Sequence, residues 1–202
     1  TERDSTYSIP IYGEKGVAMK MHVNKFRGLL LFLVILLSFL PKSDVKASVA
    51  ITTDTIWSGL VELTQDVRVI NGATLTIEPG TIVRVISEDS GGTGADPYLV
   101  EIIIHDGYLA ANSVTFEADV GKQWYGIDIR ENGDAEIIDS EIKDIAGCGV
   151  WINTLNEVDL TGNDIHAING KNGIENYPNG SSAWGIFIAQ GNHVITKNDI
   201  HE

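Results

Sequence analysis

The chain has 202 residues, of which 43% are hydrophobic and 21% charged, a balance that favours one folded domain and argues against disorder. Residues 51–202 carry 7 basic and 24 acidic residues, a formal charge of −17. This charge makes nucleic acid and anionic membrane surfaces poor partners and cations better ones. The single cysteine, Cys148, excludes an intramolecular disulfide, and we interpret it as a packed side chain rather than a nucleophile.

The first fifty residues have the organisation of a leader. Residues 1–18 are polar and show no hydrophobic period, so we interpret them as a non-native upstream or disordered segment. Residues 19–50 have the pattern of a secretory signal peptide, in which basic residues precede the apolar run Gly28–Leu40. These 13 apolar residues are fewer than the roughly 20 that a transmembrane helix needs.

Small residues after the apolar run predict cleavage behind Ala47 or Ala50. An uncleaved N-terminal anchor is the alternative. Either outcome places residues 51–202 outside the cytoplasm, so we expect a secreted or cell-surface protein with no transmembrane span in its mature form.

From Ile51 onward, short alternating runs of β-forming residues are separated by Gly, Asn and Asp. Three segments align with one another, each running from a glycine to an isoleucine 15 or 16 residues later: Gly126–Ile142, Gly149–Ile165 and Gly185–Ile200. The first two glycines lie 23 residues apart and the next step is 36, so residues 171–183 form an insertion, rich in Gly, Asn, Ser and Pro.

A period near 23 with several short strands per unit predicts a β-solenoid, in which each unit is a coil that stacks on its neighbours. Two isoleucine columns should then line the interior, and one polar column should lie at a turn. The columns are Ile142, Ile165 and Ile200; Ile129, Ile152 and Ile188; and Ser140, Asn163 and Asn198. A leucine-rich repeat has the same period but needs a leucine pattern that is absent here, and a β-sandwich is the rival for residues 51–90.

The residues Asp66–Thr81 closely resemble the opening coils of secreted right-handed parallel β-helix repeat proteins, the pectate-lyase-like superfamily. The resemblance continues through Gly107–Ala111, Phe116 and Trp124–Ile127 to the coils rich in Asn and Asp. It implies an all-β, right-handed parallel β-helix over residues 51–202. Because Glu202 falls inside a coil, we expect this domain to be incomplete at its C-terminus.

The register of the repeat places four candidate catalytic side chains on one outer strand face, Asp164 beside Asp199 and His166 beside His201. Glu141 precedes the first pair. Carboxylates and imidazoles within one coil spacing could supply general acid and base groups or bind a divalent metal. The alternative is a solvated strand face without a function of its own.

A second outer column, Asp128, Trp151 and Phe187, has the composition of a carbohydrate-binding site, because exposed aromatic rings stack on sugars and carboxylates accept hydrogen bonds from hydroxyls. Alternatively, the insertion, whose end carries Trp184, packs over these rings. The acidic segment Ser87–Asp96 could collect Ca²⁺, although it lacks the ligand spacing of an EF-hand.

The resemblance implies a fold that hosts polysaccharide lyases, epimerases and hydrolases as well as adhesins and structural proteins. Two hypotheses follow. The first is a non-catalytic module that binds a polysaccharide or a cell-surface partner through its outer strand faces. The second is a carbohydrate-active enzyme, for which the small number of basic residues is unfavourable because polyuronate lyases resembling this fold use Lys or Arg at the cleavage site.

Overall fold

The computed structural model describes residues 8–12, 18–22, 48–168 and 183–202. The chain divides into two compact units, Thr1–Asp44 and Val45–Glu202. In the first unit, β1 (Ser8–Tyr12) and β2 (Ala18–His22) pair in antiparallel fashion, which the sequence did not lead us to expect. The apolar run of the predicted signal peptide lies outside the described residues.

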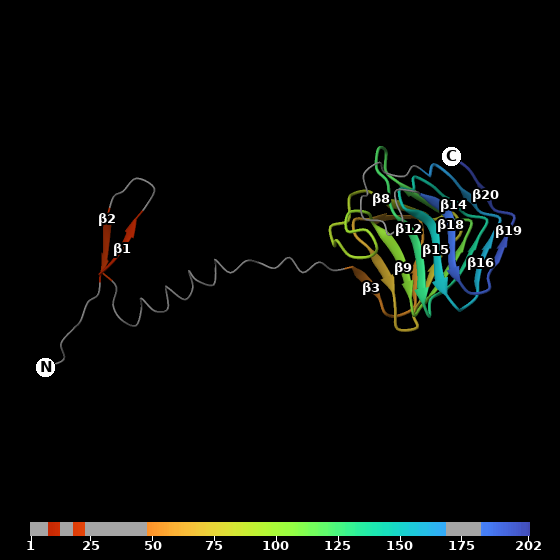
Figure 1. The fold of residues 1–202 in the computed structure, drawn as a ribbon, viewed down its shortest axis with the longest axis horizontal. Helices are drawn as coiled ribbons and strands as arrows, with labels where there is room; N and C mark the ends of the chain where they lie inside the picture. Colours follow the sequence, from red (N-terminus) through yellow and green to blue (C-terminus); the bar gives the residue numbers. More distant parts are fainter. Residues whose placement is uncertain (1–7, 13–17, 23–47, 169–182) are drawn as a thin grey trace. The chain divides into compact units, whose positions relative to one another are not determined.

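The second unit is built from three parallel sheets of six strands each (Figure 1). Sheet 1 contains β3 (Val49–Ile51), β6 (Val67–Val69), β9 (Glu101–His105), β12 (Gly126–Glu131), β15 (Cys148–Thr154) and β18 (Trp184–Gln190). Sheet 2 contains β4 (Thr55–Trp57), β7 (Thr74–Ile77), β10 (Tyr108–Asn112), β13 (Asp134–Ile138), β16 (Val158–Thr161) and β19 (Val194–Thr196). Sheet 3 contains β5 (Leu60–Leu63), β8 (Ile82–Val85), β11 (Thr115–Ala118), β14 (Glu141–Ile142), β17 (Asp164–Ile165) and β20 (Asp199–Ile200).

Each strand from β3 to β17 pairs with the strand three places later, so three successive strands make one coil and each coil stacks on the next. This is the architecture of a parallel β-solenoid and confirms the all-β parallel fold that the repeat predicts. The structure assigns no helix to the described residues, and accordingly no helix there has the length and apolarity to cross a membrane.

The first coils follow the same rule as the others. β3, β4 and β5 pair in parallel with β6, β7 and β8, so the β-sandwich alternative for residues 51–90 is wrong. β3 begins at Val49, two residues before the predicted start of the domain. Cleavage behind Ala47 would keep β3 whole, whereas cleavage behind Ala50 would remove most of it.

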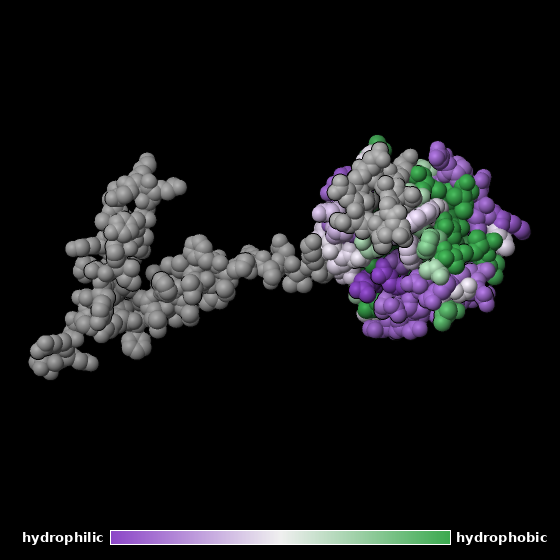
Figure 2. Space-filling view, viewed as in Figure 1, coloured by the Kyte–Doolittle hydropathy of each residue, from purple (hydrophilic) through white to green (hydrophobic). Residues whose placement is uncertain are grey.

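The interior is a single apolar cluster formed by the inward side chains of all three sheets. Both predicted isoleucine columns are confirmed by the strand register: Ile142, Ile165 and Ile200 in sheet 3, and Ile129, Ile152 and Ile188 in sheet 1. Ile142 and Ile165 are fully buried, whereas Ile200, in the last coil, is 47% exposed. Figure 2 shows hydrophobic surface on the side of the unit where the last strands lie.

The glycines that open the repeat are explained by close packing at the start of each sheet 1 strand. A Cβ atom on Gly126, whose φ is 130°, would lie 1.7 Å from the carbonyl oxygen of Cys148. At Gly149 a Cβ would lie 2.5 Å from the carbonyl oxygen of Gly185 and 3.0 Å from a methyl group of Ile165. These positions therefore accept no side chain.

The predicted polar column lies at the turn between sheets 2 and 3. Asn163 Oδ1 accepts a hydrogen bond from the backbone N–H of Ser140 at 3.0 Å, and Asn163 Nδ2 donates to the carbonyl of Ile137 at 2.8 Å. Asn198 Oδ1 in turn accepts from the backbone N–H of Asn163 at 2.9 Å. The side-chain amides thus satisfy backbone groups that a turn leaves without strand partners.

Candidate functional site

The four predicted catalytic residues lie on the outer face of sheet 3, where Asp164 and Asp199 are register partners. His166 Nε2 lies 3.0 Å from Glu141 Oε1, and His201 Nε2 lies 3.1 Å from Asp164 Oδ1. The two imidazole rings stack with their centroids 5.2 Å apart and their planes 4° from parallel. The structure therefore brings the histidines together, each with a carboxylate.

Ion pairs continue this row of polar side chains across the neighbouring strands. Lys143 Nζ lies 3.0 Å from Glu141 and 3.4 Å from Glu117, whose other carboxylate oxygen lies 2.6 Å from Arg84. Burial alone would raise the pKa of Glu141, but hydrogen bonds from His166 and Lys143 outweigh it and lower that pKa. The charges of Arg84, Glu117, Lys143 and Glu141 are thus each matched by an opposite charge.

His201 directly follows β20, the last strand of this face. The carbonyl of Glu202 and the carboxylates of Asp164 and Asp199 raise the pKa of His201. The Asp164 and His201 side chains are both about half exposed. A hollow of about 410 Å³ on the same sheet is lined by Arg84, Glu117 and the loop that follows β11, and by none of the four predicted residues.

The predicted carbohydrate-binding column lies on the outer face of sheet 1, where Asp128, Trp151 and Phe187 occupy one register position on three neighbouring strands. The Trp151 and Phe187 rings stack with centroids 4.3 Å apart and an interplanar angle of 23°. Trp184 joins them, with its ring 6.3 Å from that of Trp151 and 5.2 Å from that of Phe187. We call these three half-buried rings the aromatic platform.

From the sequence, Trp184 was predicted to belong to the end of the insertion and not to the aromatic column. It is the first residue of β18 and the register partner of Cys148. Trp184 directly precedes the repeat glycine, as Tyr125 and Cys148 do in their coils. This shared position could have predicted that Trp184 belongs to the strand. Of the insertion itself, residues 171–182 lie outside the described residues.

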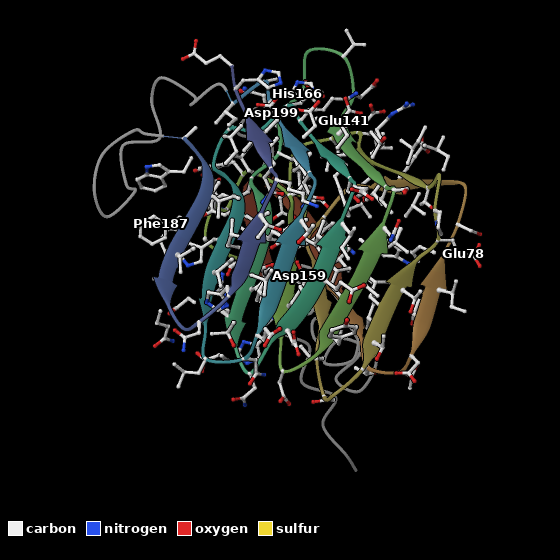
Figure 3. All side chains as sticks on the ribbon, turned by 90° about the vertical axis from the view of Figure 1, so that its right-hand side faces the viewer. Glu78, Glu141, Asp159, His166, Phe187 and Asp199 are labelled. Carbon is white, nitrogen blue, oxygen red and sulfur yellow. The ribbon has the colours of Figure 1, made fainter. Side chains whose placement is uncertain are left out.

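A small second core supports the platform from below. It consists of Leu99, Tyr125, Ala146 and Cys148, and the three platform rings pack against it. Burial raises the pKa of the Cys148 thiol to about 12, so this cysteine is a neutral packing residue at physiological pH. Figure 3 shows Phe187 projecting from β18, well away from Glu141, His166 and Asp199.

Asp128 departs from the exposed position expected of it. Only 3% of its surface is exposed, and its carboxylate pairs with Arg130 on the same strand. The reason is that Ile103 and Trp151 flank it on the neighbouring strands, while Arg130 lies beside it on the same face. Its Oδ1 atom is buried and has no hydrogen-bond partner among the residues that the structure describes.

Two side-chain amides lie beside the platform. The register of β15 and β18 shifts between Ile152 and Asn153, so that Ala189 is skipped and Gln190 becomes the partner of Asn153. Such a bulge redirects a side chain. Asn153 and Gln190 are both exposed.

Two of the three carboxylates in the acidic segment Ser87–Asp96, those of Asp89 and Asp96, are buried, whereas Glu88 is exposed. Asp89 accepts hydrogen bonds from the backbone N–H groups of Gly91 and Thr93 at 2.9 and 3.0 Å. Beneath the segment, the fully buried Glu101 accepts bonds from Ala95 and Asp96. Across the described ranges, no three or more His, Cys, Asp or Glu side chains are grouped to hold a metal ion.

Comparison of the chain with protein-family models, with curated proteins and with solved structures found no match. What the chain does is therefore inferred from the geometry of its own side chains. Two outer faces carry candidate chemistry, the aromatic platform with its amides on sheet 1 and the histidine–carboxylate pairs on sheet 3.

Proposed function

We propose that residues 51–202 form a secreted or cell-surface β-helix module that binds polysaccharide, free or on a surface partner, through the outer face of sheet 1. In this proposal the solenoid is right-handed and belongs to the pectate-lyase-like superfamily, as its opening coils suggest. Residues 19–50 act as the export signal.

The aromatic platform is the observation that carries the proposal. Trp151 and Phe187 lie on neighbouring coils, about 4.8 Å apart along the solenoid axis. Because the two rings stack on each other, they present an apolar strip of ring edges that runs along this axis. Sugar rings bind aromatic side chains through their apolar C–H faces. A strip along the axis suits a chain of sugars better than a single one.

Charge supports a carbohydrate over the other large polymers that an exposed protein meets. A domain with a formal charge of −17 repels phosphate backbones and anionic lipid. Sugar hydroxyls carry no charge and are not subject to this repulsion. The proposal therefore includes no nucleic-acid partner and no membrane partner.

The test is affinity electrophoresis of the full chain through gels containing soluble polysaccharides. We expect at least one polysaccharide to retard the wild-type protein and Trp151→Ala to weaken binding tenfold or more. Tyr98→Ala is the matched control, because Tyr98 is an aromatic residue 68% exposed outside the platform. If no polysaccharide retards the wild type, or if both variants bind equally well, the proposal is wrong.

A carbohydrate-active enzyme, a lyase, epimerase or hydrolase, is the second candidate. The observation that favours it is the pairing of His166 with Glu141 and of His201 with Asp164, each within hydrogen-bond distance, which is the arrangement of a general base and its orienting carboxylate. Asp199 lies beside the second pair.

The enzyme hypothesis is tested by incubating the full chain with polysaccharides, with and without Ca²⁺, and measuring new reducing ends and unsaturated products. Turnover that is lost in His166→Ala and His201→Ala would establish the enzyme and displace the module. His193→Ala is the control, since His193 lies in the turn before β19. Binding without turnover leaves the module as the function.

A further inference from the structure

The amides beside the aromatic platform indicate which class of polysaccharide it takes. Asn153 and Gln190 are exposed register partners on β15 and β18, and within the described part of the chain neither side chain makes a hydrogen bond. Each amide offers two N–H donors and one carbonyl acceptor. Neighbouring hydroxyls of a sugar present the complementary acceptors and donors without any charge.

The bulge in β18 is what makes this pair. With regular pairing, Ala189 would stand opposite Asn153, and the last coil would offer a methyl group at this position. Skipping Ala189 brings a second amide to the same column, two register positions beyond the stacked rings of Trp151 and Phe187. The rings and amides thus form two parallel rows, one apolar and one polar, over the same two coils.

The charges on these strands point away from an acidic ligand. Arg130 is the one basic residue of β12, β15 and β18, and its guanidinium already pairs with Asp128. Glu131, also on β12, is exposed. An anionic sugar stacked on the platform would thus meet no unpaired cation among these strands and would face the negative field of the domain.

We infer that the aromatic platform binds an uncharged glycan chain along the solenoid axis, with the apolar ring edges of Trp151 and Phe187 contacting its C–H groups and Asn153 and Gln190 hydrogen-bonding its hydroxyls. This inference rests on the proposed polysaccharide-binding function and adds to it the substrate class and two specificity-determining residues. Uncharged chains are selected because the polar row contains amides where an acidic glycan would require Arg or Lys.

The experiment compares soluble polysaccharides that share a backbone and differ in charge. Suitable pairs are hydroxyethylcellulose with carboxymethylcellulose, methyl-esterified with free polygalacturonate, and glycol chitin with glycol chitosan, supplemented by an array of uncharged, sulfated and carboxylated glycans. Binding of the full chain is measured at low and at physiological salt, because attraction between charges weakens with salt and stacking does not.

The expected result is binding to an uncharged chain, with an affinity that salt leaves nearly unchanged. Asn153→Ala and Gln190→Ala should each weaken that binding about fivefold, the equivalent of one net hydrogen bond of about 1 kcal/mol. Asn112→Ala, an exposed amide at the end of β10 in sheet 2, should leave it unchanged. Circular dichroism confirms that each variant is folded.

Three other outcomes are possible, and the first two separate the inference from the function on which it rests. Binding to a charged chain in preference to its uncharged partner, abolished by Trp151→Ala, would overturn the inference and leave polysaccharide binding intact. Binding to an uncharged chain that both amide variants retain in full would overturn the assigned roles of Asn153 and Gln190. Absence of binding to every glycan would overturn the proposed function together with the inference.

Discussion

The buried carboxyl group of Glu101 should make the domain less stable as the pH rises, and Glu101→Gln should remove that dependence. Glu101 lies in β9 of sheet 1, fully buried beneath the acidic segment. Its Oε1 atom accepts hydrogen bonds from the backbone N–H groups of Ala95 and Asp96 at 2.8 and 2.7 Å. Asp66, Arg130 and these two N–H groups are the charged and polar groups that act on it.

Burial raises the pKa of Glu101 from its ordinary 4.5 to about 8, with a further contribution from the negative charge of Asp66 and with the two N–H groups opposing the change. The folded protein therefore holds this proton more tightly than the unfolded chain. The resulting stabilisation is complete below pH 4.5, declines as the pH rises, and is lost above pH 8. At 1.36 kcal/mol per pH unit, the whole loss amounts to roughly 5 kcal/mol.

The measurement is urea unfolding of the full chain, followed by tryptophan fluorescence from pH 5 to pH 8. We expect the free energy of unfolding of the wild type to fall by about 3 kcal/mol relative to that of Glu101→Gln over this range. Glu136→Gln, at an exposed glutamate of β13, is the matched control and should follow the wild type. Parallel pH profiles for the wild type and Glu101→Gln would refute the reasoning.

In the isoleucine column of sheet 3, replacing isoleucine by alanine should destabilise the protein more at a buried position than at an exposed one. Ile165→Ala, at a fully buried position, should lower the free energy of unfolding by about 3–4 kcal/mol. Ile200→Ala, at a half-exposed position, should lower it by about 1–2 kcal/mol. Equal losses would contradict the stacked interior. Asn163→Ala should cost about 2–3 kcal/mol, because it removes the side-chain partner of two backbone groups in the preceding coil, the N–H of Ser140 and the carbonyl of Ile137; a loss below about 0.5 kcal/mol in urea unfolding would refute this role for the polar column. The Cys148 thiol, with its pKa raised to about 12, should resist a disulfide reagent at pH 8 until urea is added, and rapid labelling of the folded protein would show that the second core is open.

The stacked interior could be predicted from the sequence because a solenoid repeats one local environment. Each coil places its isoleucines in the same surroundings, so Ile142 and Ile165 recur at one spacing and meet in space. The asparagine column follows from the same rule. Distances along the chain therefore translate directly into contacts, which is not the case in folds without a repeat.

The outer faces were harder to predict because they depend on features that do not repeat. Asp128 occupies the same column as Trp151, but burial between its neighbours and pairing with Arg130 remove it from the surface. The pairing of Asn153 with Gln190 depends on a bulge in a single strand, and no residue in that strand predicts the bulge. Register predicted which residues share a face, whereas exposure and pairing required coordinates.

One further consequence follows from the uneven length of the coils. The chain takes 23 residues from Asp128 to Trp151 and 36 from Trp151 to Phe187, yet both steps connect direct register partners. The extra residues between β17 and β18 therefore leave the register of Trp151 with Phe187 unchanged. The length and composition of this connection can thus change in evolution or by design while the strands before and after it keep their sequences.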